Sequence, residues 1–140
     1  MGWFVFACVS AVAAAATAIL AKVGVEGVPS TLATAIRTLV VLVVAWATVF
    51  ALGEHREIGA ISRRSLIFLT LSGIATGISW LAYFRALQLG PASRVAPIDK
   101  LSVVLVAVFA VAFLGERLSG PNWLGIVFIG AGAVLVAYKA

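Results

Sequence analysis

The chain has 140 residues, of which 64% are hydrophobic and only 11% are charged, and its formal net charge is +5. A soluble domain averages roughly 45–50% apolar and about 25% charged residues, so this composition excludes a soluble globule and indicates an all-α integral membrane protein. The positive charges lie between or within apolar runs, so they report membrane topology, and the expected partner is the lipid bilayer and no nucleic acid.

Five apolar runs are long enough to cross the membrane as helices. A helix needs about 20 residues to span roughly 30 Å of hydrocarbon. Open strands would leave backbone groups unpaired in lipid, and barrel strands would be shorter and would alternate in polarity. We therefore expect one transmembrane domain over residues 1–140, an integral membrane bundle of five transmembrane helices. Their expected ranges are 3–21, 30–52, 66–89, 92–114 and 122–138.

No combination of residues suggests catalysis or a bound metal. Cys8 is the only cysteine and His55 the only histidine, so there is neither a disulfide framework nor a set of metal ligands. The chain also has no phosphate-binding glycine loop and no nucleophile elbow. We expect no cofactor, no metal and no enzymatic activity.

Five helices place the termini on opposite sides of the membrane, which we name face A (N-terminal) and face B (C-terminal). Face A receives Arg56, Arg63, Arg64 and Arg117, and face B receives Lys22, Arg94 and Lys139, with Arg85 near the end of the third run. Because Lys and Arg accumulate in cytoplasmic loops, face A is favoured in the cytoplasm, but only slightly. So small a bias allows a chain to insert in both orientations, which is dual topology.

Three ionisable residues, Arg37, Asp99 and Lys100, fall inside the apolar runs in one layer near face B. Arg37 and Asp99 each lie seven residues into their run. This corresponds to a depth of roughly 10 Å. A charge at that depth costs at least about 2.5–3.5 kcal/mol and usually faces a bundle interior or a water-filled cavity. We predict that Arg37 pairs with Asp99, which leaves Lys100 for another partner. A carboxylate in this low-dielectric layer is also a candidate for proton coupling, which makes Asp99 the residue to test.

These charges also have a structural interpretation. The long side chains of Arg37 and Lys100 could extend to face B, and an Arg37–Asp99 pair could simply tie the second and fourth helices together. Pro97 likewise has two interpretations. It interrupts the fourth helix and frees the carbonyl of Ser93, as in transporters with broken helices, or it begins a helix that starts late.

The third run contains a stripe of polar residues and, beside it, two glycines four residues apart. Hydroxyl groups recur at helical spacing, and together with aromatic rings they could line a solute path, or they could bond back to their own helix. The stripe comprises Ser72, Thr76, Ser79, Trp80 and Tyr83. Small residues favour close helix packing, and the candidates are Gly73 and Gly77 in this run and Gly125 and Gly130 in the last.

Several segments resemble a known family. "NWLGIVFIGAGAVLVA" after "FLGERLSG" is similar to the closing segment of EamA domains in the drug/metabolite transporter superfamily. "LATAIRT" and "APIDKLSVV" resemble the short, five-helix bacterial and archaeal branch, and the likeness covers nearly the whole chain. The resemblance implies an inner-membrane (plasma-membrane), multi-pass permease of small solutes. Longer members of the superfamily have ten helices in two halves of opposite orientation around a central cavity, and this chain resembles one half.

Three alternative functions are consistent with these sequence features. The first is a secondary transporter, an exporter of a small metabolite that acts as an antiparallel homodimer with a central cavity. The second, implied by small members of the superfamily, is a subunit of a flippase for lipid-linked sugars or another accessory membrane protein. The third is a membrane scaffold whose buried charges only orient helices, which predicts that leucine at both positions 37 and 99 preserves function.

Overall fold

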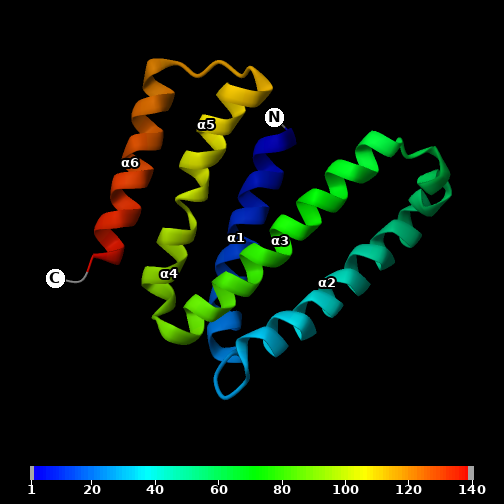
Figure 1. Cartoon of the computed structure of the whole chain (residues 1–140), viewed down its shortest axis with the longest axis horizontal. Coiled ribbons are helices and arrows are strands. Elements are labelled where there is room, and N and C mark those ends of the chain that lie inside the picture. Colours follow the sequence, from blue (N-terminus) through cyan, green and yellow to red (C-terminus); the bar gives the residue numbers. More distant parts are fainter. Residues whose placement is uncertain (1, 139–140) are drawn as a thin grey trace. The chain divides into compact units, whose positions relative to one another are not determined.

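The computed structural model describes residues 2–138, so Lys139, which was counted on face B, lies outside the described residues. The elements in chain order are α1 (Gly2–Gly24), α2 (Ser30–Leu52), the 3-10 helix η1 (Glu54–Ala60), α3 (Arg63–Leu89), α4 (Ala92–Asp99), α5 (Ser102–Leu114) and α6 (Gly120–Ala137) (Figure 1). Residues 2–138 contain no strand. By length and composition, five helices can cross a membrane, with 92–114 counted as one span. The predicted all-α fold with five membrane-spanning helices is confirmed.

The observed helix boundaries differ from the predicted ones for local reasons. The second helix has the predicted range, 30–52. The third begins at Arg63, before the apolar run, because Ser62 caps it: the Ser62 Oγ accepts a hydrogen bond from the Ser65 amide at 3.0 Å. The last begins at Gly120 because Pro121 fits its first turn, where a missing amide hydrogen costs little. The polar segment between the second and third helices contains η1.

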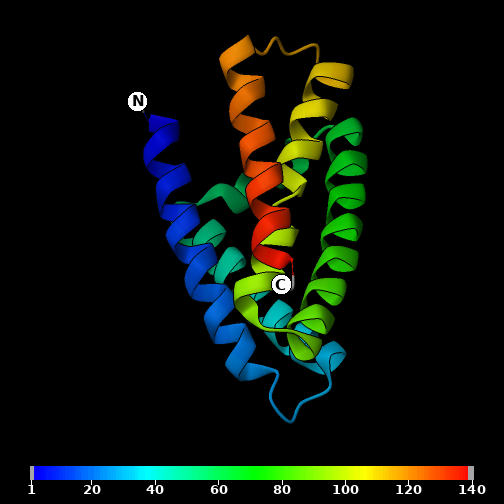
Figure 2. The same ribbon diagram turned by 90° about the vertical axis from the view of Figure 1, so that its left-hand side faces the viewer.

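The chain divides into two compact units, one formed by Met1–Lys22 with Leu89–Ala140 and the other by Val23–Gln88. The expectation of a single domain over residues 1–140 stays a prediction. In the first unit, α6 packs against α4 and α5 (Figures 1 and 2). Gly115, at φ 68°, ends α5 in the left-handed conformation that glycine adopts without strain. The Lys22 Nζ donates to the carbonyl oxygen of Gly90 at 3.0 Å.

In the second unit, α2 and α3 run in opposite directions and η1 connects them (Figure 1). Gly53, at φ 76°, ends α2 and lets the chain turn into η1. At the opposite end of the unit, Gln88 Nε2 donates to the carbonyl oxygen of Val28 at 3.0 Å and Gln88 Oε1 accepts from Arg85 at 2.7 Å. A single side chain of α3 thus holds the segment that leads into α2.

Most large apolar side chains point away from the protein. Phe6 is 77% exposed and Phe113 is 80% exposed, whereas Leu87 is fully buried. Soluble monomers rarely expose contiguous apolar surface on this scale, and lipid is the solvent that suits it. The hydrogen bonds of the helical backbone are made within each helix, as the hydrocarbon core requires. The chain is therefore a multi-pass membrane protein.

Candidate functional site

The buried charge of α2 lies against aromatic rings of α3. The guanidinium carbon of Arg37 is 4.1 Å from the ring centroid of Trp80 and 5.4 Å from that of Phe84. Arg37 and Trp80 are half-buried and Phe84 is buried. A cation over an aromatic face gains about 0.5–2 kcal/mol, which offsets part of the roughly 2.5–3.5 kcal/mol that a membrane-embedded arginine costs. We name Arg37, Trp80 and Phe84 the Arg37 cluster.

The acid predicted to pair with Arg37 belongs to the other unit, so the Arg37–Asp99 pair stays a prediction. Within its own unit, Asp99 has a cationic neighbour in Lys100. The Lys100 Nζ lies 3.5 Å from the Asp99 Oδ2, and the two side chains are 56% and 37% exposed. Their charges thus remain available for a further contact.

The fourth span is interrupted where these charges lie. Pro97 stands inside α4, which begins at Ala92, so it does not mark a late helix start. Pro97 has no amide hydrogen for the carbonyl of Ser93, and α4 ends two residues later. The Lys100 amide donates to the carbonyl oxygens of Ala96 and Pro97, at 3.2 and 3.1 Å.

Beyond the interruption, the hydrogen-bond pattern is also displaced. The Val103 amide donates to the carbonyl oxygen of Lys100 at 3.0 Å, and so not to that of Asp99 four residues back. α5 then begins at Ser102. The fourth span therefore presents irregular backbone together with two charged side chains. In membrane proteins, such backbone occurs where protein or a water-filled cavity surrounds it.

The residues of the polar stripe of α3 have different surroundings. Thr76 Oγ1 donates to the carbonyl oxygen of Ser72 at 2.9 Å, so this hydroxyl bonds its own helix. Ser72 and Ser79 are exposed. The Tyr83 ring, half-buried, meets the neighbouring Phe84 ring at 6.5 Å between centroids. Trp80 is the stripe residue that contacts Arg37, and a solute path along the whole stripe stays a prediction.

The four candidate packing glycines have different surroundings. A Cβ atom on Gly130 would lie 3.3 Å from Val104 Cγ2, so α6 approaches α5 closely at this point. A Cβ atom on Gly73, Gly77 or Gly125 would meet nothing within 4 Å. Of these residues, Gly130 therefore makes a close helix contact within the described chain.

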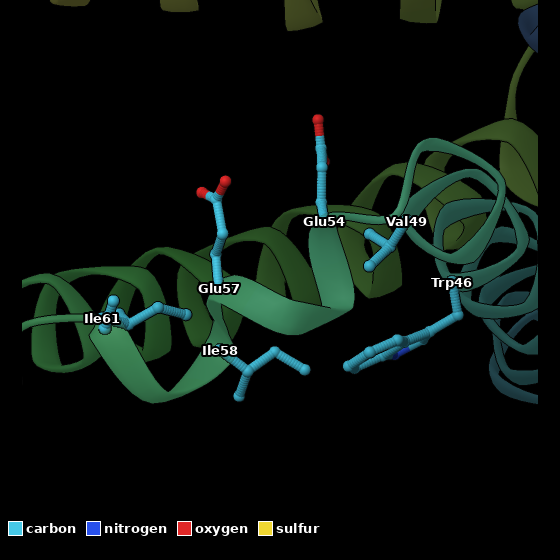
Figure 3. A pocket seen from close by; sticks show the side chains of 7 residues that line it. Trp46, Val49, Glu54, Glu57, Ile58 and Ile61 are labelled. Atoms are coloured by element: carbon cyan, nitrogen blue, oxygen red, sulfur yellow. The ribbon is translucent and has the colours of Figure 1, made fainter.

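A shallow hollow near face A was not predicted. It has a volume of about 420 Å³ and is lined by Trp46 and Val49 of α2 and by residues of η1 and the turn after it. The side chains of Glu54 and Glu57 point to one side of η1, and those of Trp46 and Ile58 lie on the other (Figure 3). Residues 2–138 contain no group of three potential metal ligands. The lining of the hollow is mostly apolar, with the two glutamates at one side.

Sequence reasoning found Arg37 and Trp80 but missed Phe84. Phe84 lies four residues after Trp80, so both rings occupy one face of α3. This spacing was a usable signal. It does not reveal the partner, because any cation of a neighbouring helix at that depth could contact the pair.

Comparison with known proteins identifies the family. The model of the EamA-like transporter family matches residues 1–138. A protein of Sinorhizobium sp named an uncharacterized transporter in the cobO 3' region is 57% identical over 135 residues, 96% of either chain. The ArnE protein of Yersinia pestis, named a probable 4-amino-4-deoxy-L-arabinose-phosphoundecaprenol flippase subunit, is 31% identical over 74 residues, 53% of this chain and 65% of its own.

A further relative is the protein MJ1333.1 of Methanocaldococcus jannaschii, 27% identical over 84 residues, 60% of this chain and 61% of its own. No solved structure matches. The five spans, the match over 1–138 and the identity of 57% agree with the resemblance seen in the sequence. The chain belongs to the EamA-like transporter family.

Proposed function

We propose that this transporter exports a small polar or amphipathic metabolite across the inner (plasma) membrane by secondary transport, without enzymatic activity. The observation that carries the proposal is the interruption of the fourth span, where irregular backbone, Asp99 and Lys100 occur together. Transporters place substrate and coupling ions at such interruptions, because free backbone groups and helix ends bind charge there. A span that served only as an anchor would have no reason to keep this costly feature.

We further propose that two copies form an antiparallel homodimer with a central cavity. The chain has five spans, and inverted repeats around a central site are a general solution for alternating access. The nearly even distribution of Lys and Arg between the two faces suits insertion in both orientations. An antiparallel copy would supply the second half of the transport path.

A second candidate function is a subunit of a flippase for lipid-linked sugars. The similarity to the ArnE protein favours it, at 31% identity over 74 residues. A flippase subunit would have one orientation and a partner protein, and it would retain a lipid substrate. These properties separate it from a dual-topology homodimer.

Membrane orientation tests the proposal. Single cysteines would replace Gly59 in η1 and Glu26 in the turn between α1 and α2, in a background with serine for Cys8. Gly59 and Glu26 are exposed, and a Cβ atom on Gly59 meets nothing within 4 Å. We expect a membrane-impermeant thiol reagent to label about half of each variant in intact cells. Full labelling at one position and none at the other would contradict the antiparallel homodimer.

Metabolite release tests transport itself. Cells that express the chain would be compared with cells that express an Asp99→Asn variant, and the metabolites of the two media would be measured by mass spectrometry. We expect the wild-type chain to raise at least one extracellular metabolite and the variant to lower that release. Equal release from both would refute a role of Asp99 in transport. A lipid-linked sugar that co-purifies with an obligate partner would instead support the flippase subunit.

A further inference from the structure

The Arg37 cluster presents a cation that contacts two aromatic rings through its face. The guanidinium carbon lies over the Trp80 ring, with Phe84 next to it. Within its own unit, residues 23–88, the guanidinium has neither a hydrogen-bond acceptor nor an acidic partner. A guanidinium carries five N–H donors in a planar fork, and aromatic contacts through its face leave the donors at its edge unsatisfied. In a membrane span, those donors require an acceptor.

The charge around the cluster favours an anion. The acidic residues of the 23–88 unit are Glu26, Glu54 and Glu57, which lie in the turns and η1 beyond the ends of α2 and α3. The charged residue in the same part of α3 is Arg85, which is also a cation. An organic cation would meet repulsion at this level of the unit. A carboxylate or phosphate would match the donor fork of Arg37 in a bidentate contact.

We propose that Arg37, supported by Trp80 and Phe84, binds the carboxylate or phosphate of an organic anion or zwitterion. The aromatic rings would cover the apolar part of the same molecule next to the charged group. This inference rests on the proposed transport function and specifies its solute class. The anion could come from a free metabolite or from a lipid headgroup, and the experiment separates these sources.

The fluorescence of Trp80 measures binding at the cluster directly. Phenylalanine would replace Trp3, Trp46 and Trp123, so Trp80 would be the remaining tryptophan. The full chain in dodecyl maltoside would be titrated with sodium benzoate and with inorganic phosphate at constant ionic strength. Benzylamine, a cation similar in size to benzoate, and mixed micelles that contain phosphatidylglycerol would be separate arms.

Three arginine variants in this background identify the binding group. Arg37→Gln removes the charge and most donors, and Arg37→Lys keeps the charge without the fork. Arg64→Gln is the matched control, because the Arg64 guanidinium also lies over a ring, that of Phe68 at 5.9 Å, at the start of α3. Far-UV circular dichroism and gel filtration would confirm that each variant folds.

We expect benzoate or phosphate to change the emission saturably and benzylamine to have no effect. Binding should weaken at least about tenfold in Arg37→Gln, less in Arg37→Lys, and stay unchanged in Arg64→Gln. A response to phosphatidylglycerol alone would keep the anion site and assign it to a lipid headgroup.

Two results would overturn the inference. The first is no response to any anion, which is the outcome if a carboxylate of the chain such as Asp99 already occupies the fork. The second is equal binding by wild type and Arg37→Gln. If either result occurs while cells that express the wild-type chain still release the metabolite, the transporter proposal stands and an organic anion bound at Arg37 is excluded. Loss of both binding and release would count against both.

Discussion

The tight packing of Gly130 in α6 against Val104 in α5 gives a sharp test of how these helices pack. A Cβ atom on Gly130 would lie 3.3 Å from Val104 Cγ2, at the short limit for carbon–carbon contacts. Gly130→Val adds that atom and two methyl groups against a β-branched neighbour with little rotamer freedom. Gly125→Val is the matched control, since it makes the same change in the same helix at a position with nothing within 4 Å.

The surroundings of the two glycines set the expected difference in the free energy of unfolding between these variants. Both substitutions replace glycine with valine in α6, so the change in helix propensity cancels between them. What remains is the cost of overpacking at Gly130, typically about 1–3 kcal/mol. We therefore expect the free energy of unfolding of Gly130→Val to be about 1–3 kcal/mol below that of Gly125→Val. Gly130→Ala should be nearly neutral, because a neighbour need shift only slightly.

Unfolding in mixed micelles of sodium dodecyl sulfate and dodecyl maltoside, followed by circular dichroism, would measure these differences. A double-mutant cycle identifies the contact, since Val104→Ala removes the methyl group that the new side chain meets. We expect Val104→Ala to rescue Gly130→Val with a coupling energy of about 0.5–3 kcal/mol. Equal destabilisation at positions 125 and 130, or a coupling near zero, would refute this packing of α5 on α6.

Two further predictions concern helix ends and the interrupted span. Ser62→Ala should lower the free energy of unfolding by about 0.5–2 kcal/mol, because the Ser62 Oγ accepts a hydrogen bond from the Ser65 amide. Ser119→Ala is the control and should change it little, because Ser119 makes no side-chain cap at α6. Equal effects of the two substitutions in the mixed-micelle assay would contradict the cap. Pro97→Ala supplies the missing amide for the Ser93 carbonyl, so it should raise the free energy of unfolding by about 1 kcal/mol. Because it repairs the interruption of the fourth span, it should also reduce metabolite release. Unchanged release would contradict a role of the interruption in transport.

The outcome for individual residues shows what a single sequence can predict about the candidate site. The depth of Arg37 follows from its distance to the helix start, and the shared face of Trp80 and Tyr83 follows from helical periodicity. The contact of Arg37 with Trp80 and Phe84 does not follow from either. It depends on the rotation of α2 against α3, and two apolar helices in lipid offer no hydropathy pattern that fixes this rotation.

The sequence by itself determined the membrane class, the five spans and the residues that can be charged within them, because transfer into hydrocarbon penalises polar groups more than any local preference can offset. Tertiary structure decided which ring covers Arg37, which glycine brings two helices together and where the fourth span ends after Pro97. These features depend on side-chain packing and on competing backbone hydrogen bonds. Differences of about 1 kcal/mol decide between such alternatives, and they arise only when the helices are in contact.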